Sequence, residues 1–117
     1  ILKTCKLDKC SYTVAHYTPK ALEVGWSEDH LDALETYSES DLFAYYEQEA
    51  LQLAELITSR PDEIQDDFWT QLNNHYTSDQ IVELITLIGF FSLVNRLVLA
   101  LRVELEPRFT ETPVTAG

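Results

Sequence analysis

The residues from Ile81 to Val103 form the least polar run of the sequence, and they constrain the fold more than any other segment. Apolar residues would lie on nearly every side of a helix built from this run. A membrane-spanning helix needs about 20 consecutive apolar residues, but Asn95 and Arg96 interrupt this one. We therefore predict the central helix of a helical bundle, with its additional apolar face buried against another subunit.

Start and stop signals of helices divide the rest of the chain. Gly25 is a natural left-handed stop, Pro19 predicts a kink or two abutting helices, and Thr77 is a predicted N-cap. The predicted segments are the end of a helix at 1–7, a break at 8–9, and helices at 10–24, 27–38, 40–60, 61–75 and 77–103.

These segments predict an all-α bundle of about six helices in a single domain over residues 1–105. We find no strand alternation, internal repeat or glycine-rich phosphate loop in the sequence. Residues 106–117 are rich in Thr and Pro, and we expect a flexible tail there. The sequence starts at Ile1 and contains no methionine, so we expect that further sequence precedes it.

Charge and cysteine content limit the classes of partner and the compartment. Twenty acidic against eight basic residues give a formal charge of −12, which disfavours nucleic acid and anionic membrane surfaces as partners. Most of this charge is expected on the solvated faces of helices. With only two cysteines and no secretory signal pattern, the chain is expected in the reducing cytoplasm, without a disulfide framework.

Cys10 is the strongest candidate for a reactive group. A thiol in the first turn of a helix lies at the positive end of the helix dipole, and Lys9 adds a cation, so both favour the thiolate, while Asp8 opposes it. The alternative is that Cys10 is a small core residue. Cys5 would lie on a different face of a continuous helix, so a disulfide with Cys10 requires the chain to fold back at Asp8-Lys9.

The histidines offer proton carriers rather than a metal site. His16 and His30 are candidate proton carriers, and His75 lies at a predicted helix end. No pair of Cys and His residues has a tight chelating spacing on one helix face, so we predict neither a metal nor another cofactor.

The order of several motifs resembles the carboxymuconolactone decarboxylase family, in its AhpD-like alkylhydroperoxidase branch. The resemblance covers the chain up to Val103. It rests on residues 1–10, on Tyr12, Val14, Ala15, Thr18, Ala21 and Gly25, and on segments 26–34, 50–58, 76–84 and 95–97. The resemblance implies an all-helical fold and assembly into trimers or hexamers.

The redox branch of that family carries Cys-x-x-Cys-x-x-x-His, in which the second cysteine attacks the peroxide and the first resolves the disulfide. On this pattern Cys10 matches the first cysteine, Thr13 stands in place of the second, and Tyr17 stands in place of the histidine, with His16 one residue earlier. Threonine cannot form a thiolate, so the family's dithiol cycle is not available at these positions.

The resulting site hypothesis consists of Cys10, Thr13, His16 and Tyr17. The leading function is a thiol-dependent peroxidase or antioxidant protein, in which Cys10 is oxidised to a sulfenic acid and an external thiol reductant recycles it. One alternative is a non-catalytic oligomeric helical protein that binds a small molecule or a partner. Another is a cofactor-independent lactone decarboxylase, for which Lys20 and Arg96 are the chief cations available.

Overall fold

The computed structural model describes residues 1–110 and is built from helices, with no strand in that range. The prediction of an all-α fold is confirmed. Its elements are α1 (Leu2–Leu7), α2 (Ser11–Glu23), α3 (Glu28–Asp32), a 3-10 helix (Tyr37–Glu39), α4 (Tyr45–Ser59), a second 3-10 helix (Pro61–Glu63), α5 (Asp66–His75), α6 (Ser78–Leu101) and α7 (Pro107–Thr110).

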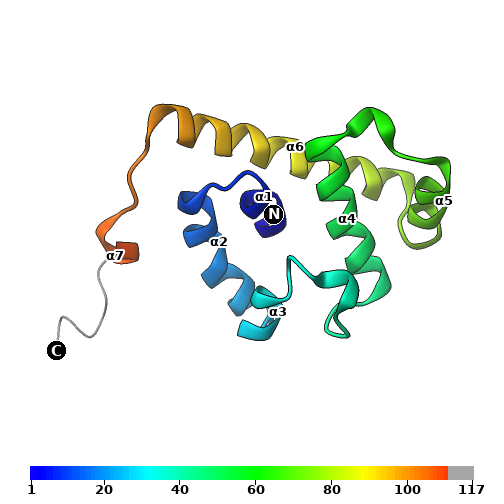
Figure 1. Ribbon diagram of the computed structural model, residues 1–117, viewed down its shortest axis with the longest axis horizontal. Helices are drawn as coiled ribbons and strands as arrows, with labels where there is room; N and C mark the ends of the chain where they lie inside the picture. Colours follow the sequence, from blue (N-terminus) through cyan, green and yellow to red (C-terminus); the bar gives the residue numbers. More distant parts are fainter. Residues whose placement is uncertain (111–117) are drawn as a thin grey trace.

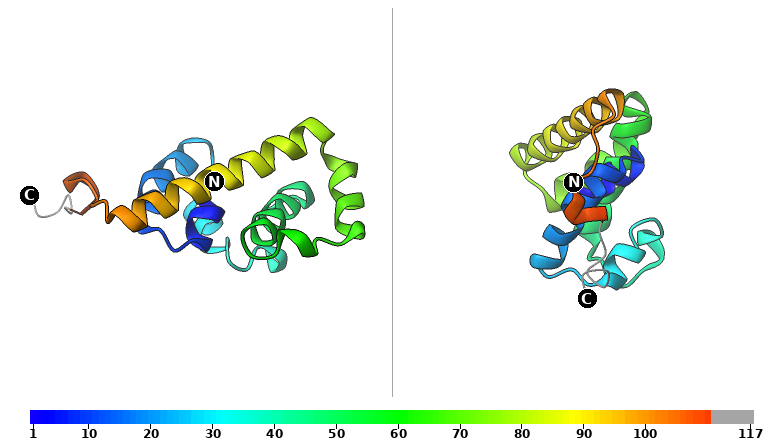
Figure 2. Two further views of the ribbon diagram at one scale, coloured as in Figure 1. Left: turned by 90° about the horizontal axis from the view of Figure 1, so that it is seen from above. Right: turned by 90° about the vertical axis from the view of Figure 1, so that its left-hand side faces the viewer.

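The helices are arranged around the short helix α1 (Figure 1). Helix α6 runs along one side of the molecule, and α1 lies beneath its middle, between α2 and α4. Figure 2 shows α6 crossing over α1 from a second direction. Contacts join α1 to α2, α4 and α6. The prediction that the 81–103 run is the central helix is therefore wrong, because the centre of the bundle is α1.

Helix α1 is held at the centre of the bundle by its buried side chains and by a hydrogen bond to the segment that follows α3. The side chains of Leu2, Lys3, Thr4 and Cys5 are all buried. Nζ of Lys3 donates a hydrogen bond of 3.1 Å to the carbonyl of Leu34, where the chain turns after α3. This bond satisfies a carbonyl that no helical N–H reaches, and it places the Lys3 cation near a helix C-terminus.

The buried apolar side chains form two clusters. One joins α4, α5 and α6, and contains Leu53, Ala54, Phe68, Leu72, Ile81 and Ile88. The other lies beneath α1 and contains Leu2, Leu31, Leu34, Tyr37 and Phe43. The fold therefore has one core around the N-terminal half of α6 and another between α1, α3 and α4.

Helix α6 carries apolar side chains on both its inner and its outer face. The inner face is buried against the bundle and includes Ile81, Ile88 and Phe91. The opposite face is exposed and carries Val82, Phe90, Leu93, Leu97 and Leu101, which follow the spacing of one helical stripe. We call these five residues the outer stripe. By length and composition α6 could also span a membrane, and 22% of its most apolar window is buried.

Three helix boundaries differ from the predictions. The segment predicted as one helix at 27–38 is interrupted after Asp32, and α4 begins at Tyr45 rather than at Ser40-Asp41. At the start of α4, the Gln48 amide donates to the carbonyls of Ser40 and Phe43 and holds a non-helical turn. Pro61 opens a 3-10 turn, and α5 begins only at Asp66.

Part of the predicted tail is structured. Glu106 and the residues of α7 fold back toward α2, and Phe109 lies against His16, with ring centroids 4.5 Å apart. The remainder of that prediction, residues 111–117, lies outside the described residues.

Candidate functional site

The two cysteines meet where α1 ends and α2 begins. Lys9 adopts a left-handed conformation with φ of 55°. Its N–H donates to the carbonyl of Lys6, and the N–H of Cys10 donates to the carbonyl of Cys5, each at 3.1 Å. This pair of bonds is the Schellman ending of a helix, which brings the side chains of its first and sixth residues together. Cys5 and Cys10 are those two residues.

Cys10 is the N-cap of α2 rather than a residue of its first turn. Its backbone is extended, and its carbonyl accepts hydrogen bonds from the Val14 N–H at 3.1 Å and from the Thr13 hydroxyl at 3.2 Å. The prediction placed this thiol in the first turn, and the structure places it one position before the first helical residue, Ser11. Both cysteines are free and fully buried in the described chain.

A buried polar network surrounds these thiols. The Thr13 hydroxyl donates to Oδ1 of Asn95 at 2.6 Å. Nδ2 of Asn95 donates to Oδ2 of Asp8 at 2.9 Å, and the Ser92 hydroxyl donates to the same oxygen at 3.0 Å. Asn95 is fully buried. Its two hydrogen bonds join α6 to Asp8 at the end of α1 and to Thr13 in the first turn of α2.

The sulfur of Cys5 belongs to this network. Burial raises the pKa of the Cys5 thiol, while hydrogen bonds with the side chains of Thr13 and Asn95 lower it. A thiolate at Cys10 would also raise the pKa of Cys5, so the two sulfurs are close enough to interact electrostatically. The sulfur that lies near Cys10 is therefore that of Cys5.

His16 is paired with the C-terminal segment. Its Nε2 lies 2.9 Å from Oε2 of Glu106, whose other oxygen accepts a bond of 2.8 Å from the Tyr12 hydroxyl. The imidazole lies between the rings of Tyr12 and Phe109, with each centroid 4.5 Å away. The contacts of His16 are therefore with Tyr12 and the C-terminal segment rather than with Cys10 or Thr13.

Tyr17 lines a groove with the end of α2. Its ring meets the edge of Phe91 at 5.0 Å, and Nζ of Lys20 lies 4.7 Å from its centroid. The groove has a volume of about 340 Å³, and Trp26 also lines it. Of the four predicted site residues, the structure thus groups Cys10 with Thr13, while the contacts of His16 and Tyr17 are with other residues.

Contacts of the C-terminal segment with α2 are expected to weaken in acid. A hydrogen bond from its own backbone lowers the pKa of Glu106 below the ordinary 4.5, and the bonds from Tyr12 and His16 lower it further. Because the folded pKa is the lower one, this stabilisation is present above pH 4.5 and is lost as the pH falls through the folded pKa. NMR signals of the Phe109 ring should shift toward exposed values in that range. Glu106→Gln should remove this acid step, and an unchanged step in that variant would contradict the assignment to Glu106.

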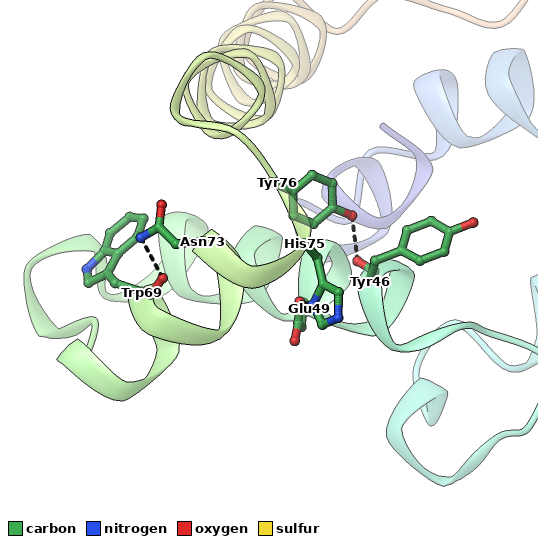
Figure 3. A network of polar contacts seen from close by, with 6 residues as sticks. All are labelled: Tyr46, Glu49, Trp69, Asn73, His75 and Tyr76. Atoms are coloured by element: carbon green, nitrogen blue, oxygen red, sulfur yellow. Dashed lines mark hydrogen bonds and ion pairs between the residues drawn. The ribbon is translucent and has the colours of Figure 1, made fainter.

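A second polar network ties α5 to α4 (Figure 3). Nδ1 of His75 lies 2.7 Å from Oε2 of Glu49, and the Tyr76 hydroxyl donates to the carbonyl of Tyr46 at 2.6 Å. These contacts fix the end of α5 against the first half of α4.

A cleft of about 670 Å³ lies beside this network and is lined by Tyr37, Glu49, Glu55, Arg60, Gln71 and His75, among others. The Tyr37 hydroxyl donates to the carboxylate of Glu55, and burial raises the pKa of this tyrosine. None of the four predicted site residues lines this cleft. Within residues 1–110 no group of three or more His, Cys, Asp or Glu side chains is placed to hold a metal ion.

Comparison with solved structures decides the fold. The chain superposes with a TM-score of 0.82 on a crystal structure from Agrobacterium tumefaciens, over 90% of this chain and 73% of that one, at 21% identity. That protein is described as one of unknown function, with a provisional assignment as the antioxidant defence protein AhpD. The chain has an AhpD-like fold. The resemblance found in the sequence is thus confirmed at the level of the fold.

Two curated relatives match parts of the chain, and no protein-family model matches it. YdfG of Bacillus subtilis is 26% identical over 101 residues, which cover 86% of this chain and 69% of YdfG. YnjA of Escherichia coli is 32% identical over 87 residues, or 74% of this chain. The chain spans about half the length of YnjA (48%). Both relatives are described as uncharacterised.

Sequence reasoning missed Cys5, Asp8, Ser92 and Asn95 as members of the site. In a continuous helix the side chains of Cys5 and Cys10 would lie on different faces. The left-handed conformation of Lys9 ends the helix and brings them together. Asn95 was visible as a polar residue inside an apolar run, which is a signal of a buried hydrogen-bonding role.

Proposed function

We propose that this AhpD-like chain is a thiol-dependent peroxidase of the carboxymuconolactone decarboxylase family, in which Cys10 reduces a hydroperoxide. The observation that carries the proposal is the position of Cys10 at the N-terminus of α2, where the Cys5 thiol is close enough to interact with it electrostatically. A helix N-terminus stabilises an anion, and the thiolate is the nucleophilic form of cysteine.

The chemistry balances with one thiol and one peroxide. The Cys10 thiolate attacks the distal peroxide oxygen, the O–O bond breaks, and an alkoxide or hydroxide leaves and takes up a proton. His16, with its partner Glu106, and Tyr17, both in the middle of α2, are the proposed proton carriers. The sulfenic acid of Cys10 is then reduced by thiols, and we place the cycle in the cytoplasm, where external thiols are abundant.

Peroxide treatment of the purified full-length protein, with a sulfenic-acid trap present, tests this function. Rapid labelling of Cys10 is expected, and Cys10→Ser should remove that label because serine cannot form a sulfenic acid. Mass spectrometry of the labelled peptide locates the modification, and circular dichroism of the variant checks that it folds. If Cys10 in the folded protein is neither labelled nor otherwise oxidised by the peroxide, the peroxidase function is wrong.

A second candidate is a non-catalytic oligomeric binding protein, and one observation favours it. Both sulfurs are fully buried in the described chain, and buried cysteines are commonly inert. The lactone decarboxylase alternative gains no such support, because Lys20 lies over Tyr17 while Arg96 is exposed on α6.

For the partners, we propose that copies of this chain associate through the outer stripe of α6. The five side chains of the stripe are exposed and apolar, on the face opposite to the one that packs on the bundle. An apolar helix face of this size is commonly covered by another subunit. Trimers or hexamers are the assemblies that the family resemblance implies.

A further inference from the structure

We propose that Cys5 is the resolving thiol of this site and that oxidation joins Cys5 to Cys10 in an intramolecular disulfide. The peroxide step of this cycle rests on the proposed function of Cys10. The disulfide itself does not, because any oxidant of dithiols could form it. The pair is separated by four residues, so it does not follow the Cys-x-x-Cys spacing.

Backbone geometry brings the two thiols within disulfide range. The bond from the Cys10 N–H to the Cys5 carbonyl is 3.1 Å long. Each Cα lies only one or two covalent bonds from a hydrogen-bonded atom, so the two Cα atoms can be no more than about 7 Å apart, the upper limit for a disulfide. Because the Schellman ending also turns the two side chains toward each other, little backbone movement is needed to form the bond.

The surroundings of Cys5 suit a resolving thiol better than an attacking one. Burial raises the pKa of Cys5, which lowers its thiolate fraction, while Thr13 and Asn95 hydrogen-bond its sulfur and oppose that effect. A thiol of higher pKa is the stronger nucleophile once it is deprotonated. Cys10, at the helix N-terminus, is then the thiol that meets the peroxide, and Cys5 meets the product.

The two steps balance. Attack by Cys10 on a hydroperoxide gives the Cys10 sulfenic acid and an alcohol or water. The Cys5 thiolate then attacks the sulfur of that sulfenic acid, the S–O bond breaks, and the hydroxide that leaves takes a proton to become water. An external dithiol reduces the Cys5–Cys10 disulfide by exchange, so the dithiol is oxidised and both cysteines return to thiols.

The test uses the full chain, oxidised separately by diamide and by a modest excess of hydroperoxide at low protein concentration. After the remaining thiols are blocked, trypsin cuts after Lys3, Lys6, Lys9 and Lys20, so the disulfide would link peptide 4–6 to peptide 10–20. The intact chain should lose the mass of two hydrogens and remain a single chain on a non-reducing gel. Dithiothreitol should reverse the change.

Two variants sharpen the test. In Cys5→Ser the linked peptide should be lost, and the trapped sulfenic acid at Cys10 should increase several-fold because nothing resolves it. Thr4→Ser is the matched control, since Thr4 is equally buried in α1 and its hydroxyl has no hydrogen-bond partner among the described residues. The linked peptide should persist in this control.

The outcomes separate the two proposals. A linked peptide after diamide, with no reaction of Cys10 toward peroxide, supports the pair and overturns the peroxidase function. A Cys10 that peroxide oxidises but that forms no link to Cys5, with either oxidant, overturns the pair and leaves the function in place. Disulfides only between different chains would also overturn it.

Discussion

Asn95→Leu is expected to lower the free energy of unfolding by about 3 kcal/mol, the larger of two stability effects predicted around the site. Leucine has the same number of side-chain heavy atoms as asparagine and the same branching at Cγ, so the substitution leaves no cavity. The substitution removes the partner of the Thr13 hydroxyl and one of the two donors to the Asp8 carboxylate. The cost arises because these groups are left buried or partly buried without their hydrogen bonds.

Urea unfolding followed by circular dichroism measures this effect, with all variants at one protein concentration because association would shift the midpoint. Ser92→Ala is the matched control on the same helix. It removes only the second donor to Asp8 and should cost about 1 kcal/mol. If Asn95→Leu proves no more costly than Ser92→Ala, the network does not hold α6 to the α1–α2 turn.

We propose that copies of the chain associate through the outer stripe, so Leu97→Glu is expected to give monomers of 13.5 kDa. Leu97 lies between Leu93 and Leu101 in the outer stripe, and its side chain is 51% exposed in the described chain. A glutamate there would be solvated in the monomer, but buried without a partner in an interface between copies. The variant should therefore lose the assembly and keep its helical content.

Light scattering after gel filtration measures the mass, and Val24→Glu is the control. Val24 is 81% exposed at the end of α2, away from the stripe, so its replacement should leave the mass unchanged. A wild-type protein that is already monomeric, or a Leu97→Glu variant that stays assembled, would exclude the outer stripe as the interface. Sedimentation of the monomer with lipid vesicles would then point to a membrane as the cover of α6.

The elements with strong periodicity were predicted well because their signal is local. Thr77 caps α6 through a bond from the Gln80 N–H, as its sequence position indicates. Gly25 ends α2 with φ of 108°, as expected for a residue without a Cβ. The error at α4 has a non-local cause, because Phe43 is buried in the second core cluster and the Gln48 side chain replaces the helical bonds there.

The site could be predicted only in part, because its geometry depends on an unusual helix ending. The sequence predicts the break at Asp8-Lys9, but Lys9 takes the left-handed position that glycine normally fills, so the form of the helix ending could not be predicted. Cys10 and Thr13 could be located from the family pattern, but the placing of Cys5 and Asn95 beside them required the packing of α1 against α2 and α6. The pairing of His16 with Glu106 depended on a segment that was expected to be a tail.

The left-handed turn at Lys9, with the Cys5–Cys10 pair that we propose, also extends the spacings at which redox pairs are to be sought in sequences. Searches for dithiol sites usually look for cysteines two residues apart at the start of a helix, and such a search passes over this chain. A helix that ends in a Schellman turn offers a different spacing, with one cysteine in its last turn and the other at the start of the next helix. In such chains, the length of the turn between two helices would set the redox chemistry, and an insertion of one residue would abolish it without touching either cysteine.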